Sequence, residues 1–143
     1  MPILETDTEI AALLARTKRI AVLGMKTEAA ADQPAFYVAK ACLELGFEIV
    51  PVPVYYPEAT HILGLPVFRR VADVTPKADM VDVFRRPKDL AAHLDDILLA
   101  RPKSVWLQLG IVDDTFANTL SEAGIDVVQD RCLMVEARRF ARR

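Results

Sequence analysis

Cysteine and histidine are scarce in this chain of 143 residues, which contains two of each. Cys42 and Cys132 stand far apart, and neither has a neighbour at the spacing of metal ligands. A disulfide framework and a zinc site are therefore excluded. No histidine lies near Cys132 in the sequence to activate its thiol, and no other nucleophile–base pair is evident. We predict no metal ligand and no catalytic residue.

Long apolar runs and a charge excess are also missing. No stretch approaches the roughly 18 consecutive apolar residues of a membrane-spanning helix, and the N-terminus carries acidic residues where a signal peptide would be basic. The 18 basic and 20 acidic residues leave a net charge of −2, so no field attracts nucleic acid. The basic end, 138–143, is explained by cations at a helix C-terminus. We expect a cytoplasmic protein without a membrane or nucleic-acid partner.

Glycine is the third scarce residue, with five in the chain. The dinucleotide fingerprint needs three glycines after the first strand, and only Gly24 is present there. The acid that would bind the ribose of NAD is also missing, because the second strand ends in apolar residues and prolines, 50–53. These two absences argue against NAD. The turn at Gly24 is either an anion site built from backbone N–H groups and a helix dipole or an ordinary strand–helix connection.

Apolar segments that alternate with helical patterns make up the rest of the chain. Thr6 and Glu9 match a capping box, Pro34 and Pro87 suit the first turns of helices, and Asp113 or Asp114 caps another. The predicted strands are 18–23, 47–52, 66–68, 79–84, 104–109 and 125–129, and the predicted helices open after residue 6 and at 34, 87, 113 or 114, and 133. This alternation predicts one α/β domain, 1–143, with a three-layer α/β/α Rossmann-like fold and a mostly parallel five- to six-stranded sheet.

The strand 79–84 ends in two consecutive arginines, Arg85 and Arg86. Ligands bind beyond the carboxyl ends of strands in an open parallel sheet, and a guanidinium group recognises phosphate well. A phosphorylated ligand is one interpretation. The other is a solvated strand end in which an arginine pairs with Asp82 or Asp89.

Two further strand ends carry polar groups. In the strand 104–109, alternation places Trp106 and Gln108 on the same face of the sheet, and Trp106 is expected in the core. Gln108, at the strand end, can form a hydrogen bond with a ligand or a neighbouring loop. Gly110 would let a ligand approach the backbone closely.

The last strand is followed by Asp130, Arg131 and Cys132. Asp130 is a candidate cap for the closing helix, and Arg131 can pair with Glu136 or Asp130. Cys132 is interpreted as a small buried apolar residue rather than a nucleophile.

Taken in order, these motifs resemble one family. They are Gly24 after a strand, the proline-rich end of the second strand, and residues 81–85 (VDVFR), 106–110 (WLQLG) and 130–132 (DRC). The chain is similar, over about 13–140, to the small single-domain coenzyme A-binding proteins, which are related in fold to the CoA-binding domain of the succinyl-CoA synthetase α subunit.

The resemblance implies a CoA site across the strand ends. The residues that it implies for cofactor binding are Gly24, Met25 and Lys26 at the phosphates, Pro53 and Val54 at the adenosine end, and Phe84, Arg85, Gln108, Leu109, Gly110 and Arg131 in the neighbouring groove. The chain departs from the family at Met25 and Lys26, where a small residue and serine are usual, and at 52–54, where an asparagine is missing.

The leading hypothesis is non-catalytic binding of CoA or an acyl-CoA. One alternative is an acyl-CoA-handling enzyme that uses Cys132 or the carboxylate of Asp82 or Asp130. Another is a regulatory or interaction protein that has lost the ligand. A homodimer is possible in each case, because short helices carry many apolar residues.

Overall fold

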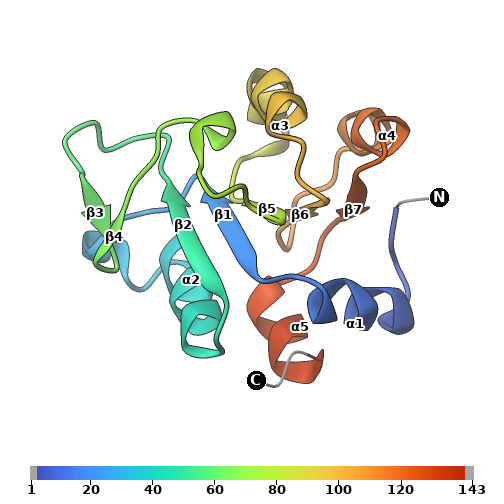
Figure 1. Ribbon diagram of the computed structural model, residues 1–143, viewed down its shortest axis with the longest axis horizontal. Helices are drawn as coiled ribbons and strands as arrows, with labels where there is room; N and C mark the ends of the chain where they lie inside the picture. The colour runs from blue at the N-terminus through green and yellow to red at the C-terminus, as the bar shows by residue number, and fades with distance from the viewer. Residues whose placement is uncertain (1–2, 141–143) are drawn as a thin grey trace.

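Five apolar segments pair into a parallel sheet in the computed structural model, which describes residues 3–140 (Figure 1). The strands are β1 (Arg19–Leu23), β2 (Glu48–Val52), β5 (Met80–Val83), β6 (Ser104–Leu107) and β7 (Asp126–Val128). Their order in the sheet is β2-β1-β5-β6-β7, and all four pairings are parallel. The predicted fold class, a three-layer Rossmann-like α/β fold, is confirmed.

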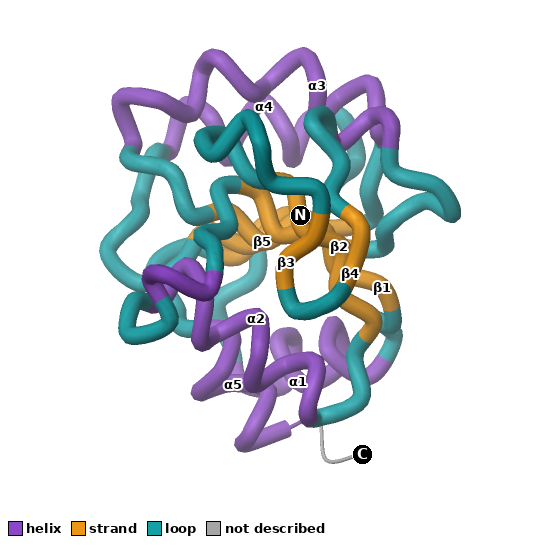
Figure 2. The backbone as a smooth tube through the Cα atoms, turned by 90° about the vertical axis from the view of Figure 1, so that its left-hand side faces the viewer, coloured by secondary structure: helices purple, strands orange, loops and turns teal. Residues whose placement is uncertain are grey.

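Helices cover both faces of the sheet (Figures 1 and 2). One layer contains α1 (Asp7–Ala15), α2 (Pro34–Glu44) and α5 (Leu133–Phe140), and the other contains α3 (Leu94–Ala100) and α4 (Asp114–Glu122). Short 3-10 helices occupy Glu28–Ala30, Val71–Asp73 and Pro87–His93. No helix between residues 3 and 140 has the length and apolar character needed to cross a membrane.

Each strand sends alternate side chains into two separate cores, as a parallel sheet covered on both faces requires. Val22 and Trp106 belong to the core under α1, α2 and α5. Leu23 and Leu107 belong to the core under α3 and α4. Trp106 is 0% exposed, which confirms its predicted place in the core.

Local signals set several helix ends. Thr6 accepts a hydrogen bond from the backbone N–H of Glu9, whose carboxylate accepts one from the N–H of Thr6 at 3.0 Å, so the predicted capping box is present. Pro34 occupies the first turn of α2, and the side chain of Asp113 caps α4 by accepting from the N–H of Phe116. Asp113 is therefore the cap, not Asp114.

Two predicted elements differ from the structure. The third strand, 66–68, is not part of the main sheet. Instead β4 (Leu65–Pro66) pairs antiparallel with β3 (His61–Ile62) beside the β2 edge (Figure 2). Leu63 and Gly64 make the tight turn between them with φ of 55° and 71°, as a two-residue hairpin demands. The helix predicted from Pro87 begins as a 3-10 segment and becomes α-helical only at Leu94.

Candidate functional site

The order of the strands reverses between β1 and β5. The chain runs from β1 to β2 on one side and later places β5 on the other side of β1. In open α/β sheets, ligands bind beyond the carboxyl ends of the strands at such a switch point. The loops after β1 and β5 therefore border the position where this fold holds a ligand.

Gly24 lets these two loops meet. Its φ is +85°, and a Cβ atom at this position would lie 2.5 Å from the carbonyl oxygen of Phe84. The N–H of Gly24 donates to the carbonyl of Val52, and the N–H of Phe84 donates to the carbonyl of Leu23, both at 2.9 Å. Only glycine combines this φ with so close an approach of the two backbones.

Two adjoining cavities at this edge form what we call the switch-point groove. Their volumes are about 450 and 250 Å³, and they share Lys26, Phe84, Arg85 and Arg86. The remaining lining residues are Gly24, Tyr55 and Tyr56 in the smaller cavity and Gln33, Pro34, Ala35, Tyr37, Pro87, Gln108, Leu109, Gly110, Ile111 and Cys132 in the larger. The first turn of α2, the positive end of its dipole, thus lies at the wall.

Arg85 is held in place by its neighbours. Its Nε donates to Nε2 of His93 at 3.1 Å, its guanidinium lies 5.4 Å from the centre of the Tyr55 ring, and one terminal nitrogen is 3.9 Å from Asp89. Burial and the Arg85 charge both lower the pKa of His93, so the imidazole is neutral and accepts the bond. The Arg85 side chain is 14% exposed, and little rotamer freedom is left for a ligand to remove.

Lys26 and Arg86 are the other two cations of the groove. The ammonium group of Lys26 donates to the side-chain oxygen of Gln33 at the start of α2. Arg86 pairs with Asp89 at 3.1 Å. The predicted pairing of an arginine with Asp89 is therefore confirmed, whereas pairing with Asp82 is wrong.

Asp82 instead lies within the sheet, opposite Trp106 in the register of β5 and β6, and is fully buried. Its Oδ1 accepts from Nε2 of Gln108 at 2.5 Å, while its Oδ2 has no hydrogen-bond partner. Burial raises the pKa of Asp82 to about 7, against the lowering effect of the Gln108 bond. The Gln108 oxygen accepts from the N–H of Leu133, so Gln108 joins the strand ends to the start of α5.

The structure gathers most of the predicted site residues at the groove. Those on its wall are Gly24, Lys26, Phe84, Arg85, Gln108, Leu109 and Gly110. The side chain of Met25 is fully buried in the core, Pro53 is buried, and Val54 packs against the core under α3 and α4. Tyr55 and Tyr56 line the smaller cavity in their place. They were not predicted as site residues, although their position in a proline-rich connection after the second strand distinguishes them.

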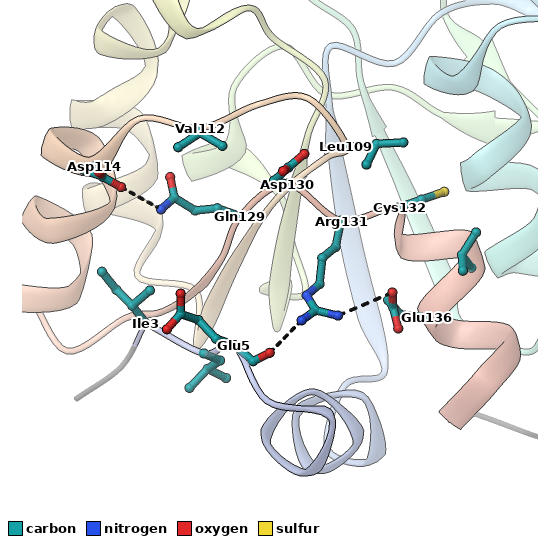
Figure 3. A pocket seen from close by; sticks show the side chains of 12 residues that line it. Ile3, Glu5, Leu109, Val112, Asp114, Gln129, Asp130, Arg131, Cys132 and Glu136 are labelled. Carbon is teal, nitrogen blue, oxygen red and sulfur yellow. Dashed lines mark hydrogen bonds and ion pairs between the residues drawn. The ribbon is translucent and has the colours of Figure 1, made fainter.

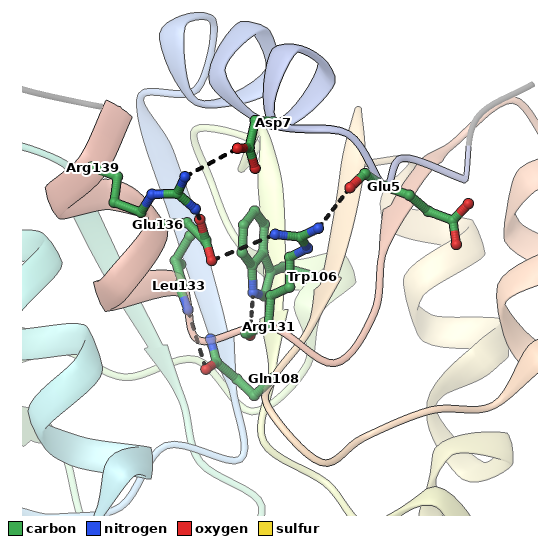
Figure 4. Close-up of polar contacts among 8 residues, drawn as sticks. All are labelled: Glu5, Asp7, Trp106, Gln108, Arg131, Leu133, Glu136 and Arg139. Carbon is green, nitrogen blue, oxygen red and sulfur yellow. Dashed lines mark hydrogen bonds and ion pairs between the residues drawn. The ribbon is translucent and has the colours of Figure 1, made fainter.

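Arg131 lies elsewhere, in what we call the N-terminal cavity, which has a volume of about 620 Å³ (Figure 3). Its guanidinium donates to the carbonyl oxygen of Glu5 at 2.6 Å and is 3.6 Å from Glu136 (Figure 4). The predicted pairing with Glu136 is confirmed. Asp130 accepts from the N–H of Gly110 at 2.7 Å rather than capping the closing helix.

The two cysteines have different surroundings. Cys42 is fully buried in α2, and burial raises the pKa of its thiol. Cys132 is half-buried and lines both the groove and the N-terminal cavity. Among residues 3–140 no three His, Cys, Asp or Glu side chains are grouped to hold a metal ion.

The parallel strand order and the groove at its reversal define an α/β protein of the Rossmann-like class. Residues 18–138 match the CoA binding domain family, and the chain belongs to this family. It is 33% identical over 130 residues to the uncharacterized protein YneT of Bacillus subtilis, covering 91% of this chain and 93% of that protein.

Solved structures show the same fold. Cell-free ID.343 from Thermus thermophilus is 40% identical with a TM-score of 0.86, over 95% of this chain and 99% of that one. A more distant match is the dinucleotide-forming acetyl-coenzyme A synthetase 1 of Ca. Korarchaeum cryptofilum, at 18% identity and a TM-score of 0.65 over 77% of this chain and 25% of that one. The latter likeness concerns the fold alone.

Proposed function

We propose that this protein binds coenzyme A or an acyl-CoA in the switch-point groove, without chemistry of its own. The observation that carries the proposal is the presence of three cations, Lys26, Arg85 and Arg86, on one groove at the reversal of strand order. The chain as a whole has a net charge of −2, so this basic lining is local. Membership of the CoA binding domain family supports the same ligand.

In this proposal the phosphates lie between Lys26, Arg85 and the first turn of α2. Arg85 is pre-positioned by His93 and Tyr55, and a positioned guanidinium group binds phosphate with little loss of entropy. Tyr55 is 61% exposed, and its ring offers an apolar surface at the nucleotide end. The apolar side chains of the larger cavity then receive the pantetheine arm.

Calorimetric titration with CoA, dephospho-CoA and NAD tests the proposal. We expect CoA to bind and NAD to give no measurable heat, because the ribose-binding acid and two of the three glycines are missing. CoA at 100-fold excess over its Kd should stabilise the folded state by about 2.7 kcal/mol. Correctly folded protein that shows neither heat nor thermal shift with CoA would contradict the proposal.

The two alternatives remain predictions with tests of their own. If the protein turns over an acyl-CoA, and Cys132→Ser abolishes this turnover but not CoA binding, the protein is an enzyme rather than a binding module. Capture of a protein partner that is unaffected by Lys26→Ala and Arg85→Ala would favour an interaction protein.

A further inference from the structure

The N-terminal cavity adjoins the switch-point groove. Leu109 and Cys132 line both of them, at the end of the groove that lies away from Tyr55. The groove is therefore cationic at one end and apolar at the other, where it meets a second cavity of about 620 Å³. A long ligand that is anionic at one end and apolar at the other matches this sequence of surroundings.

Exposed apolar side chains concentrate on the wall of this cavity. Among the residues that the structure describes, six large hydrophobic side chains are exposed, and Leu109, Val112 and Val135 are three of them. Leu109 is 70% exposed and the two valines 47% each, and all three line the N-terminal cavity. Figure 3 shows Leu109 and Val112 on its wall. A cluster of exposed apolar side chains beside a cavity marks a binding surface.

Three polar side chains of the same wall, Gln129, Arg131 and Asp130, already have partners in the protein. Gln129 accepts from the N–H of Asp113 at 2.8 Å and donates to Asp114 at 3.2 Å. Arg131 is bonded to the Glu5 carbonyl, and Asp130 accepts from the N–H of Gly110. An apolar ligand can therefore enter without leaving these groups newly unpaired, which keeps the cost of its burial low.

We propose that the N-terminal cavity binds the acyl group of an acyl-CoA whose nucleotide and pantetheine occupy the switch-point groove. This inference rests on the proposed function and names its ligand class. The wall carries four carboxylates and one arginine, which are Glu5, Asp114, Asp130, Glu136 and Arg131. This negative charge disfavours an acyl group that ends in a carboxylate. The ligand is therefore a CoA thioester whose aliphatic acyl chain carries no charged group.

The test compares CoA, acetyl-CoA, hexanoyl-CoA and succinyl-CoA by calorimetry on the unaltered protein. Hexanoyl-CoA adds apolar surface that the cavity can cover, so it should bind about tenfold more tightly than acetyl-CoA. Succinyl-CoA should bind no more tightly than CoA, because its terminal carboxylate meets a negative wall.

Single substitutions then show which cavity provides the additional affinity for hexanoyl-CoA. Val112→Asp and Val135→Asp should each abolish the tenfold preference for hexanoyl-CoA and leave the Kd for CoA within twofold. Leu99→Asp is the matched control, since Leu99 is 65% exposed and lies on α3, away from this cavity. It should change neither affinity. Circular dichroism confirms that each variant is folded, and the ligand series on the unaltered protein stands independently of all three.

The outcomes separate this inference from the proposed function. Binding of CoA with no gain from the hexanoyl chain overturns the acyl site and leaves CoA binding intact, whereas no binding of any CoA species overturns the proposed function itself. A gain that survives both valine substitutions also overturns the acyl site. If instead those substitutions change the molecular mass by light scattering and not the acyl preference, the apolar wall is a self-association surface.

Discussion

At the scale of single residues, the site depends on a glycine whose neighbour is backbone rather than side chain. Gly24→Ala would place a Cβ atom 2.5 Å from the Phe84 carbonyl at a φ of +85°, and we expect it to lower the free energy of unfolding by at least about 2 kcal/mol. Gly64→Ala is the control, because Gly64 has a φ of +71° and nothing within 4 Å of the added atom. It should cost about 1 kcal/mol. Equal losses in urea unfolding would mean that the contact with Phe84 is unimportant.

The buried carboxyl group of Asp82 makes stability depend on pH. Its pKa is about 7 in the folded protein, above its ordinary value of 3.8, because burial disfavours the charged form. The unfolded chain loses this proton first, so the contribution of Asp82 to stability is fully present below about pH 4 and is lost as pH rises from about 4 to 7, by up to about 1.4 kcal/mol per pH unit.

Asp82→Asn removes that titration and keeps the shape of the side chain. Measured by urea unfolding at several pH values, the original protein should lose stability relative to the variant between pH 5 and pH 7. Parallel curves for the two proteins would show that Asp82 does not carry the dependence.

At the scale of elements, helix ends are fixed by a few hydrogen bonds whose donors and acceptors can be recognised in the sequence. Thr6→Ala removes the acceptor for the N–H of Glu9 at the start of α1, and we expect a loss of about 1 kcal/mol in the free energy of unfolding. Thr119→Ala is a fair comparison, since Thr119 lies within α4 and its hydroxyl donates only to the carbonyl of Thr115. That variant should unfold within about 0.5 kcal/mol of the original protein. A Thr6→Ala variant equally close to the original protein would contradict the role of the cap.

At the scale of the whole molecule, the features predicted well were those with local causes. The capping box at Thr6 and the first turn of α2 at Pro34 follow from neighbouring residues. Partners distant in the sequence were not predictable in this way. Arg131 donates a hydrogen bond to the carbonyl of Glu5, 126 positions away in the sequence. Tyr55 contacts Arg85 only because the loop after β2 lies over the end of β5.

At the same scale, two lysine substitutions test whether CoA is attracted by the cations of the groove or by the charge of the protein as a whole. Lys26→Ala and Lys103→Ala change the net charge equally, from −2 to −3. Lys26 lies on the groove at the carboxyl edge of the sheet, whereas Lys103 precedes β6 at the opposite edge. If phosphate is bound locally, Lys26→Ala should weaken CoA binding about tenfold and reduce its dependence on salt, while Lys103→Ala stays within about twofold. Titrations at low and high ionic strength measure both effects. The two variants differ only in the position of the lost charge. Equal weakening of CoA binding by both would therefore show that the overall charge of the protein, and not the groove, attracts CoA.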